Sequence, residues 1–293
     1  MASRDVVQYR SPQKRILDAA VVVFLVFFTV WTVLPLFVMF VSSFKDLLAA
    51  FQLPGVGKWG DIGVFFEFTP TFKHYVGLFA DLKFGTYLAH SLIAAGGSAV
   101  ISVIFGSMAA YSLSRINFRG KNDLFFWIIS TRMAPVVAVL VPLYAIFRSA
   151  GLIGTLPGLI LAYTTFNLPF AIWTLRSVIE GIPKELDEAA MIDGANTWQI
   201  LTKVILPLAR PGLAVTAILT WVFAWNEYLF AATLTSVHAR TITTVLAEYV
   251  TVTGTNWGRL AATATLTLVP ALLFLGLVQR HIVAGLTFGA VKE

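Results

Sequence analysis

The chain alternates six long apolar runs with short polar or charged segments. Each run is close to or longer than the ~20 residues that an α-helix needs to cross the hydrocarbon core of a bilayer. Because lipid offers no hydrogen bonds, such runs are expected as helices that satisfy their own backbone groups. The predicted spans cover residues 16–41, 85–113, 124–147, 156–175, 213–234 and 260–278.

The second run differs from the others in being rich in Gly, Ala and Ser. Small side chains let neighbouring membrane helices approach closely. The span 85–113 is therefore predicted to pack against protein more than against lipid.

One segment between the fourth and fifth spans is too charged to lie in lipid. Residues 182–212 carry six acidic and basic side chains before Pro207. Pro183 suits the first position of a helix, and the acids that follow it favour the positive end of the helix dipole. Gly194 is predicted to end this helix in the left-handed conformation.

The two sides of this short helix are both partly apolar. At 100° per residue one side carries Ile182, Leu186, Ala189 and Ala190, and is expected to face its own protein. The other side carries Glu188, Met191 and Ile192. Such a helix is suited to docking into a groove on a second protein.

A second short helix is predicted to follow directly. Asn196 or Thr197 can cap its start. Its apolar stripe, which ends at Pro207, consists of Trp198, Leu201, Val204 and Ile205.

The spacing of this segment resembles the EAA loop, E-A-A-x3-G-x9-I-x-L-P, of permease subunits in bacterial binding-protein-dependent ABC importers. Val204 stands where the pattern has Ile, which is a conservative departure. In the family this loop is the contact with the ATPase, so the resemblance implies a coupling role for the residues along it. These are Glu188, Ala189, Ala190, Met191, Ile192, Asp193, Gly194, Leu206 and Pro207.

The resemblance extends over most of the chain. The segments TRMAPVVAVLVPLY, AYTTFNLPFAIW, WNEYLFA and GLTFGAVKE resemble the second permease of maltose-type carbohydrate importers. The resemblance implies an all-α polytopic membrane protein with the type I ABC importer permease fold. It also implies a second homologous permease subunit, two ATPase subunits, a periplasmic binding protein and a sugar or polyol substrate, with ATP and Mg²⁺ bound by the ATPases and no cofactor in this chain.

Composition agrees with a membrane protein. Hydrophobic residues make up 58% of the 293 and charged residues only 12%, with a mean hydropathy of +0.81. The net charge of +6 is better explained by membrane orientation than by nucleic-acid binding, because the cations lie in loops. The chain has no cysteine, no P-loop pattern G-x4-G-K-[ST] and no H-E-x-x-H, so it offers no recognisable ATP site or metal site.

The distribution of Lys and Arg predicts which side each loop faces. Thirteen of the 21 lie in the N-terminal tail 1–15, the loop 115–121, the central stretch 176–210 and the C-terminal end 280–293. The positive-inside rule therefore places both termini and the coupling loop 182–212 on the cytoplasmic side of the membrane. The resemblance implies that the permease domain 16–283 lies in a bacterial inner membrane.

Several polar or aromatic residues inside the predicted spans are candidates for a substrate path. Arg132 falls near mid-bilayer, where it must face protein or water. It either lines the path or makes a structural contact, such as one to a carbonyl freed by Pro135. Asn167 is expected to satisfy backbone near Pro169. The remaining candidates, which suit sugar hydroxyls and rings but also suit interfacial anchoring, are Trp225, Asn226 and Glu227.

The resemblance also implies partners for two further segments. The loop 235–258 is expected to face outward and meet the binding protein, or else only to pack on spans five and six. The residues named for this contact are Thr253, Gly254, Thr255 and Asn256. The tail 284–293 is expected to reach toward the ATPases or to be a solvated end.

The alternative to an importer subunit is an ion-coupled secondary carrier that uses Arg132 and Glu227. Such carriers commonly show inverted repeats with broken helices. No internal repeat is evident in this sequence, and a carrier gives no reason for the spacing of the EAA-like segment.

Overall fold

The computed structural model describes residues 12–46, 68–80, 83–235, 238–251 and 254–288. The chain divides into two compact units, one of residues 1–76 and 256–265 and one of residues 77–255 and 266–293. The helices α3 (Lys73–Ala80) and α14 (Trp257–Phe288) each contribute to both. The described part is almost entirely helical, as the apolar runs predict.

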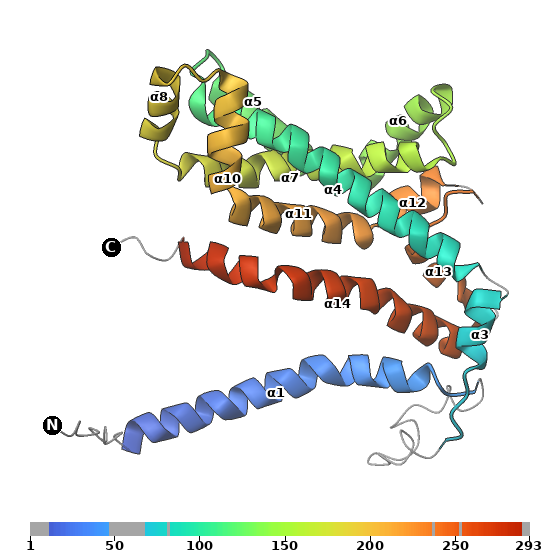
Figure 1. Cartoon of the computed structure of the whole chain (residues 1–293). Helices are drawn as coiled ribbons and strands as arrows, with labels where there is room; N and C mark the ends of the chain where they lie inside the picture. The colour runs from blue at the N-terminus through green and yellow to red at the C-terminus, as the bar shows by residue number, and fades with distance from the viewer. Residues whose placement is uncertain (1–11, 47–67, 81–82, 236–237, 252–253, 289–293) are drawn as a thin grey trace. The chain divides into compact units, whose positions relative to one another are not determined.

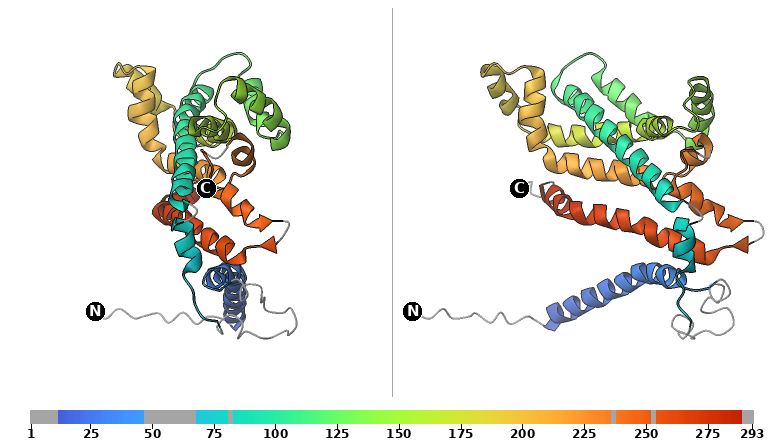
Figure 2. Two further views of the ribbon diagram at one scale, coloured as in Figure 1. Left: turned by 90° about the vertical axis from the view of Figure 1, so that its right-hand side faces the viewer. Right: turned by 45° about the vertical axis from the view of Figure 1, so that its right-hand side comes forward.

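Three helices form the centre of the larger unit (Figures 1 and 2). They are α4 (Phe84–Arg115), α7 (Leu156–Glu180) and α11 (Arg210–Trp225). The predicted close packing of the second span is confirmed, because the buried residues of α4 are mostly Ala, Ser and Gly. A Cβ at Gly106 would lie 2.9 Å from the Cβ of Ala171, so a larger residue could not keep this helix spacing.

The third predicted span is not one continuous helix, so this prediction is wrong. It consists of α5 (Lys121–Thr131) and α6 (Val136–Ser149), which are bent by 93° at the break. Pro135 sits at this break and has no N–H to continue the ladder. Four described helices are long and apolar enough to cross a membrane, and six spans result if each of two bent pairs counts as one.

The fifth predicted span is also interrupted. It divides into α11 and the short helix α12 (Leu229–Leu234), and the residues between them form a turn. The turn forms because the Glu227 carboxylate accepts the N–H groups of Phe230 and Ala231 at 3.0 and 3.3 Å. This carboxylate takes the place of helical carbonyls at the start of α12.

The charged segment folds as predicted into two short helices, at one end of the larger unit (Figure 1). The first is α8 (Glu185–Ile192). The second is a continuous helical segment built from α9 (Thr197–Gln199), the π-helix η2 (Ile200–Ile205) and α10 (Leu206–Leu208). This segment is bent by 82° relative to α11. The segment ends at Leu208, one residue after Pro207, close to the predicted end.

The opposite end of the larger unit carries α6, α12, α13 (Ile242–Glu248) and a two-stranded hairpin (Figure 2). The strands β1 (Val250–Thr251) and β2 (Gly254–Thr255) are antiparallel, and Val250 pairs with Thr255. The predicted polar loop 235–258 is therefore largely ordered into short elements.

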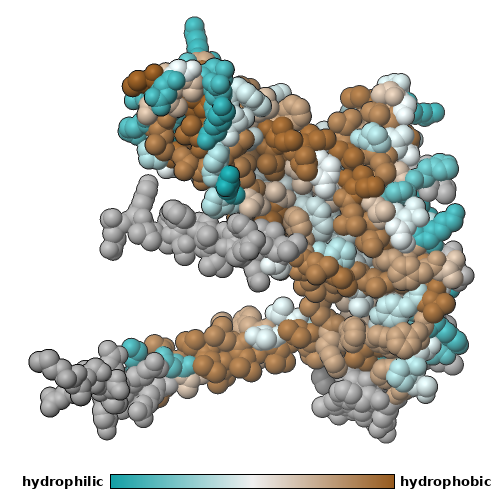
Figure 3. All heavy atoms as spheres, viewed as in Figure 1, coloured by the Kyte–Doolittle hydropathy of each residue, from teal (hydrophilic) through white to brown (hydrophobic). Residues whose placement is uncertain are grey.

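The smaller unit contains α1 (Pro12–Ser42), whose apolar side chains are exposed along its length (Figure 3). This exposure fits a helix whose neighbours are lipid or another protein. The chain after α1 is fixed to the start of α3, where the Ser43 and Tyr75 hydroxyls lie 2.7 Å apart and a His74 ring nitrogen lies 2.8 Å from the Lys45 carbonyl.

The C-terminal prediction needs one correction. The sixth span was expected to end at residue 278, with a tail from 284, whereas α14 continues to Phe288. The helix can continue because residues 271–288 contain no proline and only two glycines. Residues 289–293 and 1–11 lie outside the described part of the chain.

Candidate functional site

The helix α8 presents one side to its own protein and the other to solvent. The Asp187 carboxylate is buried, and Ala190 packs on an apolar cluster around Leu201 and Ile205. On the other side Met191 is 57% and Ile192 88% exposed, and Glu188 is exposed as well. The predicted outward face is thus outward in the structure. Figure 3 shows brown apolar side chains among teal polar ones over this end.

The prediction of which α8 residues face inward is partly wrong. Leu186 is 40% exposed and Ala189 is exposed, whereas Asp187 points inward. The reason is an attraction that apolar periodicity does not register, since Arg115 at the end of α4 draws in the Asp187 carboxylate. Their Nε and Oδ2 atoms lie 3.0 Å apart.

The end of α8 is a Schellman motif centred on Gly194. The φ of Gly194 is +83°, as the sequence predicts for this residue. Its N–H donates to the Met191 carbonyl at 3.0 Å, and the N–H of Ala195 donates to the Ala190 carbonyl at 2.9 Å. Asp193 is the exposed C-cap residue.

The next helix begins with a reciprocal cap on Asn196, one of the two predicted capping residues. The Asn196 side chain accepts the Gln199 N–H, and the Gln199 side chain accepts the Asn196 N–H, both at 2.9 Å. Leu201 and Ile205 are buried, but Trp198 is 59% exposed. Leu206 and Pro207 are half-buried near the bend into α11.

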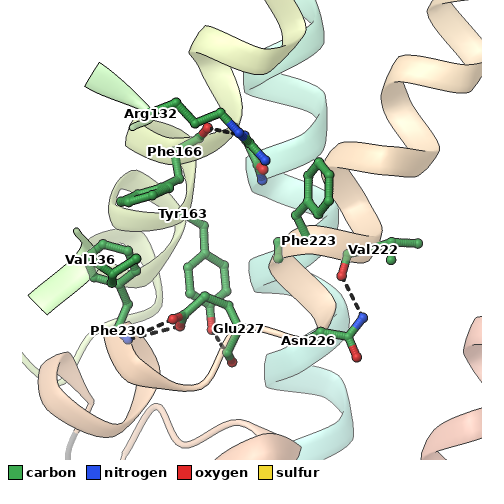
Figure 4. Close-up of a pocket in the computed structure, with 11 residues that line it drawn as sticks. Arg132, Val136, Tyr163, Phe166, Val222, Phe223, Asn226, Glu227 and Phe230 are labelled. Atoms are coloured by element: carbon green, nitrogen blue, oxygen red, sulfur yellow. Dashed lines mark hydrogen bonds between the residues drawn. The ribbon is translucent and has the colours of Figure 1, made fainter. Parts of the chain in front are cut away.

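A separate pocket of about 210 Å³ lies among α7, α11, α12 and the break between α5 and α6 (Figure 4). It brings together four of the five residues predicted for a substrate path, which are Arg132, Asn167, Asn226 and Glu227. Sequence reasoning missed its aromatic lining of Tyr163, Phe166, Phe223 and Phe230, since these residues give no signal beyond general hydrophobicity.

Arg132 lies at the end of α5 and is held by another helix. Its Nη1 donates to the Phe166 carbonyl at 2.8 Å, and its guanidinium lies 4.9 Å from the ring centre of Phe170 and 4.7 Å from that of Phe223. A carbonyl contact was one of the two predicted roles, but the acceptor belongs to α7, near Pro169, and not to the turn at Pro135. Arg132 also lines the pocket, and its predicted role in a substrate path stays a prediction.

Glu227 and Asn226 lie in the turn between α11 and α12. The Glu227 carboxylate caps α12, as described above, and the Asn226 side chain donates to the Val222 carbonyl at 2.8 Å. Figure 4 shows Glu227 at one end of the pocket and Arg132 at the other.

Two predicted path residues serve mainly in packing. Asn167 is buried, and its Nδ2 donates to Ser98 Oγ and to the Thr220 carbonyl, both at 3.0 Å, which ties α7 to α4 and α11. Trp225 does not line the pocket, because its ring stacks on Trp221 in the core with centres 4.8 Å apart.

The four residues predicted to contact a binding protein have different positions. Gly254 and Thr255 form β2, whereas Thr253 lies outside the described residues. Asn256 caps α14, since its Oδ1 accepts the Arg259 N–H at 3.1 Å.

Residues 102–287 match the family model described as "Binding-protein-dependent transport system inner membrane component". This match includes both α8 with its EAA-like spacing and the pocket. The chain belongs to this family of transport permeases.

Curated relatives extend the match. The permease is 42% identical over 230 residues to the trehalose transport system permease protein SugB of Mycobacterium tuberculosis, covering 76% of this chain and 83% of that protein. It is 36% identical to the trehalose/maltose transport system permease protein MalG of Thermococcus litoralis, covering 77% and 83%. It is 34% identical to the diacetylchitobiose uptake system permease protein DasC of Streptomyces coelicolor, covering 89% and 92%.

A solved structure supports the fold directly. A chain from the crystal structure of a bacterial ABC transporter involved in the import of the acidic polysaccharide alginate matches with a TM-score of 0.74 and 26% identity, covering 93% of this permease and 98% of that chain. The predicted all-α fold and the resemblance to ABC importer permeases are confirmed. The comparisons do not support the ion-coupled carrier.

Proposed function

We propose that this permease imports a sugar or polyol into the bacterial cytoplasm, driven by ATP hydrolysis on separate ATPase subunits. A periplasmic binding protein delivers the substrate, and a second homologous permease completes the path. Both termini lie in the cytoplasm, as the Lys and Arg distribution predicts. ATP and Mg²⁺ are held by the ATPase subunits, since this chain has no P-loop pattern.

The observation that carries this proposal is the two-sided construction of α8. Its inner side is fixed by the Asp187 carboxylate and by Ala190, whereas Met191 and Ile192 point away from the chain. Large apolar side chains exposed on a polar, membrane-peripheral helix are unfavourable unless a partner covers them. Glu188 beside them adds a carboxylate that can pair with a basic residue of the ATPase.

The substrate class is supported by the relatives and by the pocket. Three relatives carry names of systems for trehalose, trehalose/maltose or diacetylchitobiose. The pocket offers a guanidinium, an amide, a carboxylate and a phenol beside aromatic rings. These groups bind hydroxyls and the apolar faces of sugar rings, so we assign Arg132, Asn226 and Glu227 to the substrate path.

Copurification from the native host in mild detergent tests the proposal. The tagged chain is expected to bring down an ATPase and a second permease. Ile192→Asp should lower ATPase recovery while the second permease is retained, because it places a charge in the apolar contact. Ile116→Asp is the matched control, since Ile116 is also exposed but lies after α4 and outside α8. Absence of any ATPase from the wild-type preparation would refute the proposal.

A further inference from the structure

Two side chains near the end of α4 hold the first turn of α8 and the residues before it. Arg115 approaches Asp187 through Nε at 3.0 Å, and its Nη2 donates to the Ile182 carbonyl at 2.8 Å. The Tyr111 hydroxyl donates to the second oxygen of Asp187 at 3.2 Å. Tyr111 and Arg115 are four residues apart and so lie on one face of α4.

This contact is shielded from water. The side chains of Arg115 and Asp187 are only 8% and 6% exposed. A buried ion pair is screened little by salt, and removing one partner leaves an uncompensated charge. The contact is therefore a firm attachment between two elements, unlike the more exposed pair Arg176–Glu180, which lies within α7.

The other end of α4 is attached to the segment around α13. The Ser91 hydroxyl accepts the Ile242 N–H at 2.8 Å, and the His90 ring nitrogen Nδ1 lies 3.0 Å from the Arg240 carbonyl. At 1.5 Å per residue, Ser91 and Arg115 are about 36 Å apart along the helix. One helix thus joins α8 to α13 across the larger unit, as Figure 1 shows.

The middle of α4 is packed too closely to bend freely. Gly106 packs closely against Ala171 of α7. The Ser98 hydroxyl accepts a hydrogen bond from Asn167, which lines the pocket. A displacement of α8 can therefore pass into α4 as a rigid element, and from α4 to the pocket and α13. Without the attachment, the residues between α7 and α8 could absorb the displacement.

We propose that Arg115 and Asp187 are positioning residues that fix α8 to α4, so that movement of α8 by the ATPases becomes movement of α4. The two residues then touch neither substrate nor ATPase. This inference rests on the proposed function, because it requires an ATPase partner on α8.

The experiment compares basal and binding-protein-stimulated ATP hydrolysis by the purified complex in proteoliposomes. Asp187→Asn and Arg115→Gln should allow assembly, which is checked by size-exclusion chromatography, and leave basal hydrolysis near wild type. Stimulation by the binding protein should fall by about tenfold, within the usual range for coupling between sites. Glu180→Gln is the matched control, because it removes a carboxylate from an ion pair inside one helix and should keep full stimulation.

A milder variant separates positioning from folding. Arg115→Lys keeps the charge but has no planar fork to reach both Asp187 and the Ile182 carbonyl, so its stimulation should be intermediate. Wild-type stimulation of ATP hydrolysis in all three variants would overturn the inference. It would also be overturned if the variants assembled poorly but the complex that did assemble was stimulated normally. Failure of the wild-type chain to assemble with an ATPase would instead refute the proposed function.

Discussion

Arg132 and Glu227 line the same pocket but are not paired with each other. Arg132 donates to the Phe166 carbonyl, and the Glu227 carboxylate accepts the Phe230 N–H. No ion pair joins the two among the residues that the structure describes. Both charged groups are thus oriented by backbone contacts while remaining at the pocket wall, which suits a ligand with hydroxyl groups that both donate and accept.

The first prediction concerns Arg132. Arg132→Gln should reduce uptake by about tenfold or more, because a hydrogen bond to a charged group contributes ~1.5–3 kcal/mol and the contacts with two phenylalanine rings are also lost. Radiolabelled sugar uptake by the reconstituted complex measures the effect. Arg148→Gln, at the exposed end of α6, is the control and should transport normally. Equal uptake by both variants would remove Arg132 from the path.

The second prediction tests the close packing of α4 on α7. Gly106→Val should destabilise the chain by about 1–3 kcal/mol, because even its Cβ would meet Ala171 at 2.9 Å. Gly96→Val makes the same change in the same helix, where a Cβ meets nothing within 4 Å, and should cost little. Thermal unfolding of the two variants in detergent gives the comparison, and equal melting temperatures would contradict the packing.

Much of this fold follows from the sequence because the bilayer simplifies the choice of structure. Apolar runs in lipid can only be helices, so the six runs predict the helical positions well. The outward face of α8 was predicted for a similar reason, since Met191 and Ile192 follow from helical periodicity. The left-handed Gly194 follows from the preference of glycine for that conformation.

The features that the sequence did not predict depend on specific side-chain contacts, which helical periodicity does not show. The inward turn of Asp187 depends on Arg115, which is 72 residues earlier in the chain. The break before α12 depends on how the Glu227 side chain folds back onto backbone N–H groups. Trp225 was assigned to a sugar site on residue type alone, whereas its stacking on Trp221 places it in the core.

The third prediction concerns the end of α8. Gly194→Val should weaken coupled uptake strongly, because a β-branched residue is strained at a φ of +83° and the Schellman motif would open. Gly194→Asn is the matched control, since Asn tolerates this conformation, and it should retain most of the uptake. If Val and Asn behave alike, the geometry of this cap is not required for coupling.

The fourth prediction concerns the hairpin formed by β1 and β2. The chain has no cysteine, so Thr255→Cys introduces a single thiol for crosslinking. Crosslinks to the binding protein are expected in an ATP-bound, outward-facing complex. Asp123→Cys, at the start of α5 and on the predicted cytoplasmic side, should give none. Crosslinks found only from residues 42–84 would move the docking surface to that loop.

Uptake into proteoliposomes containing the purified complex, with the sugar that saturates its binding protein, tests the central claim most directly. Uptake should require ATP inside the vesicles and should persist when ion gradients are collapsed. Glu188→Lys should lower it by at least about tenfold, because it reverses a charge at the ATPase contact, while membrane insertion is unchanged. Uptake driven by an ion gradient without ATP, or wild-type uptake by the Glu188→Lys complex, would contradict the account.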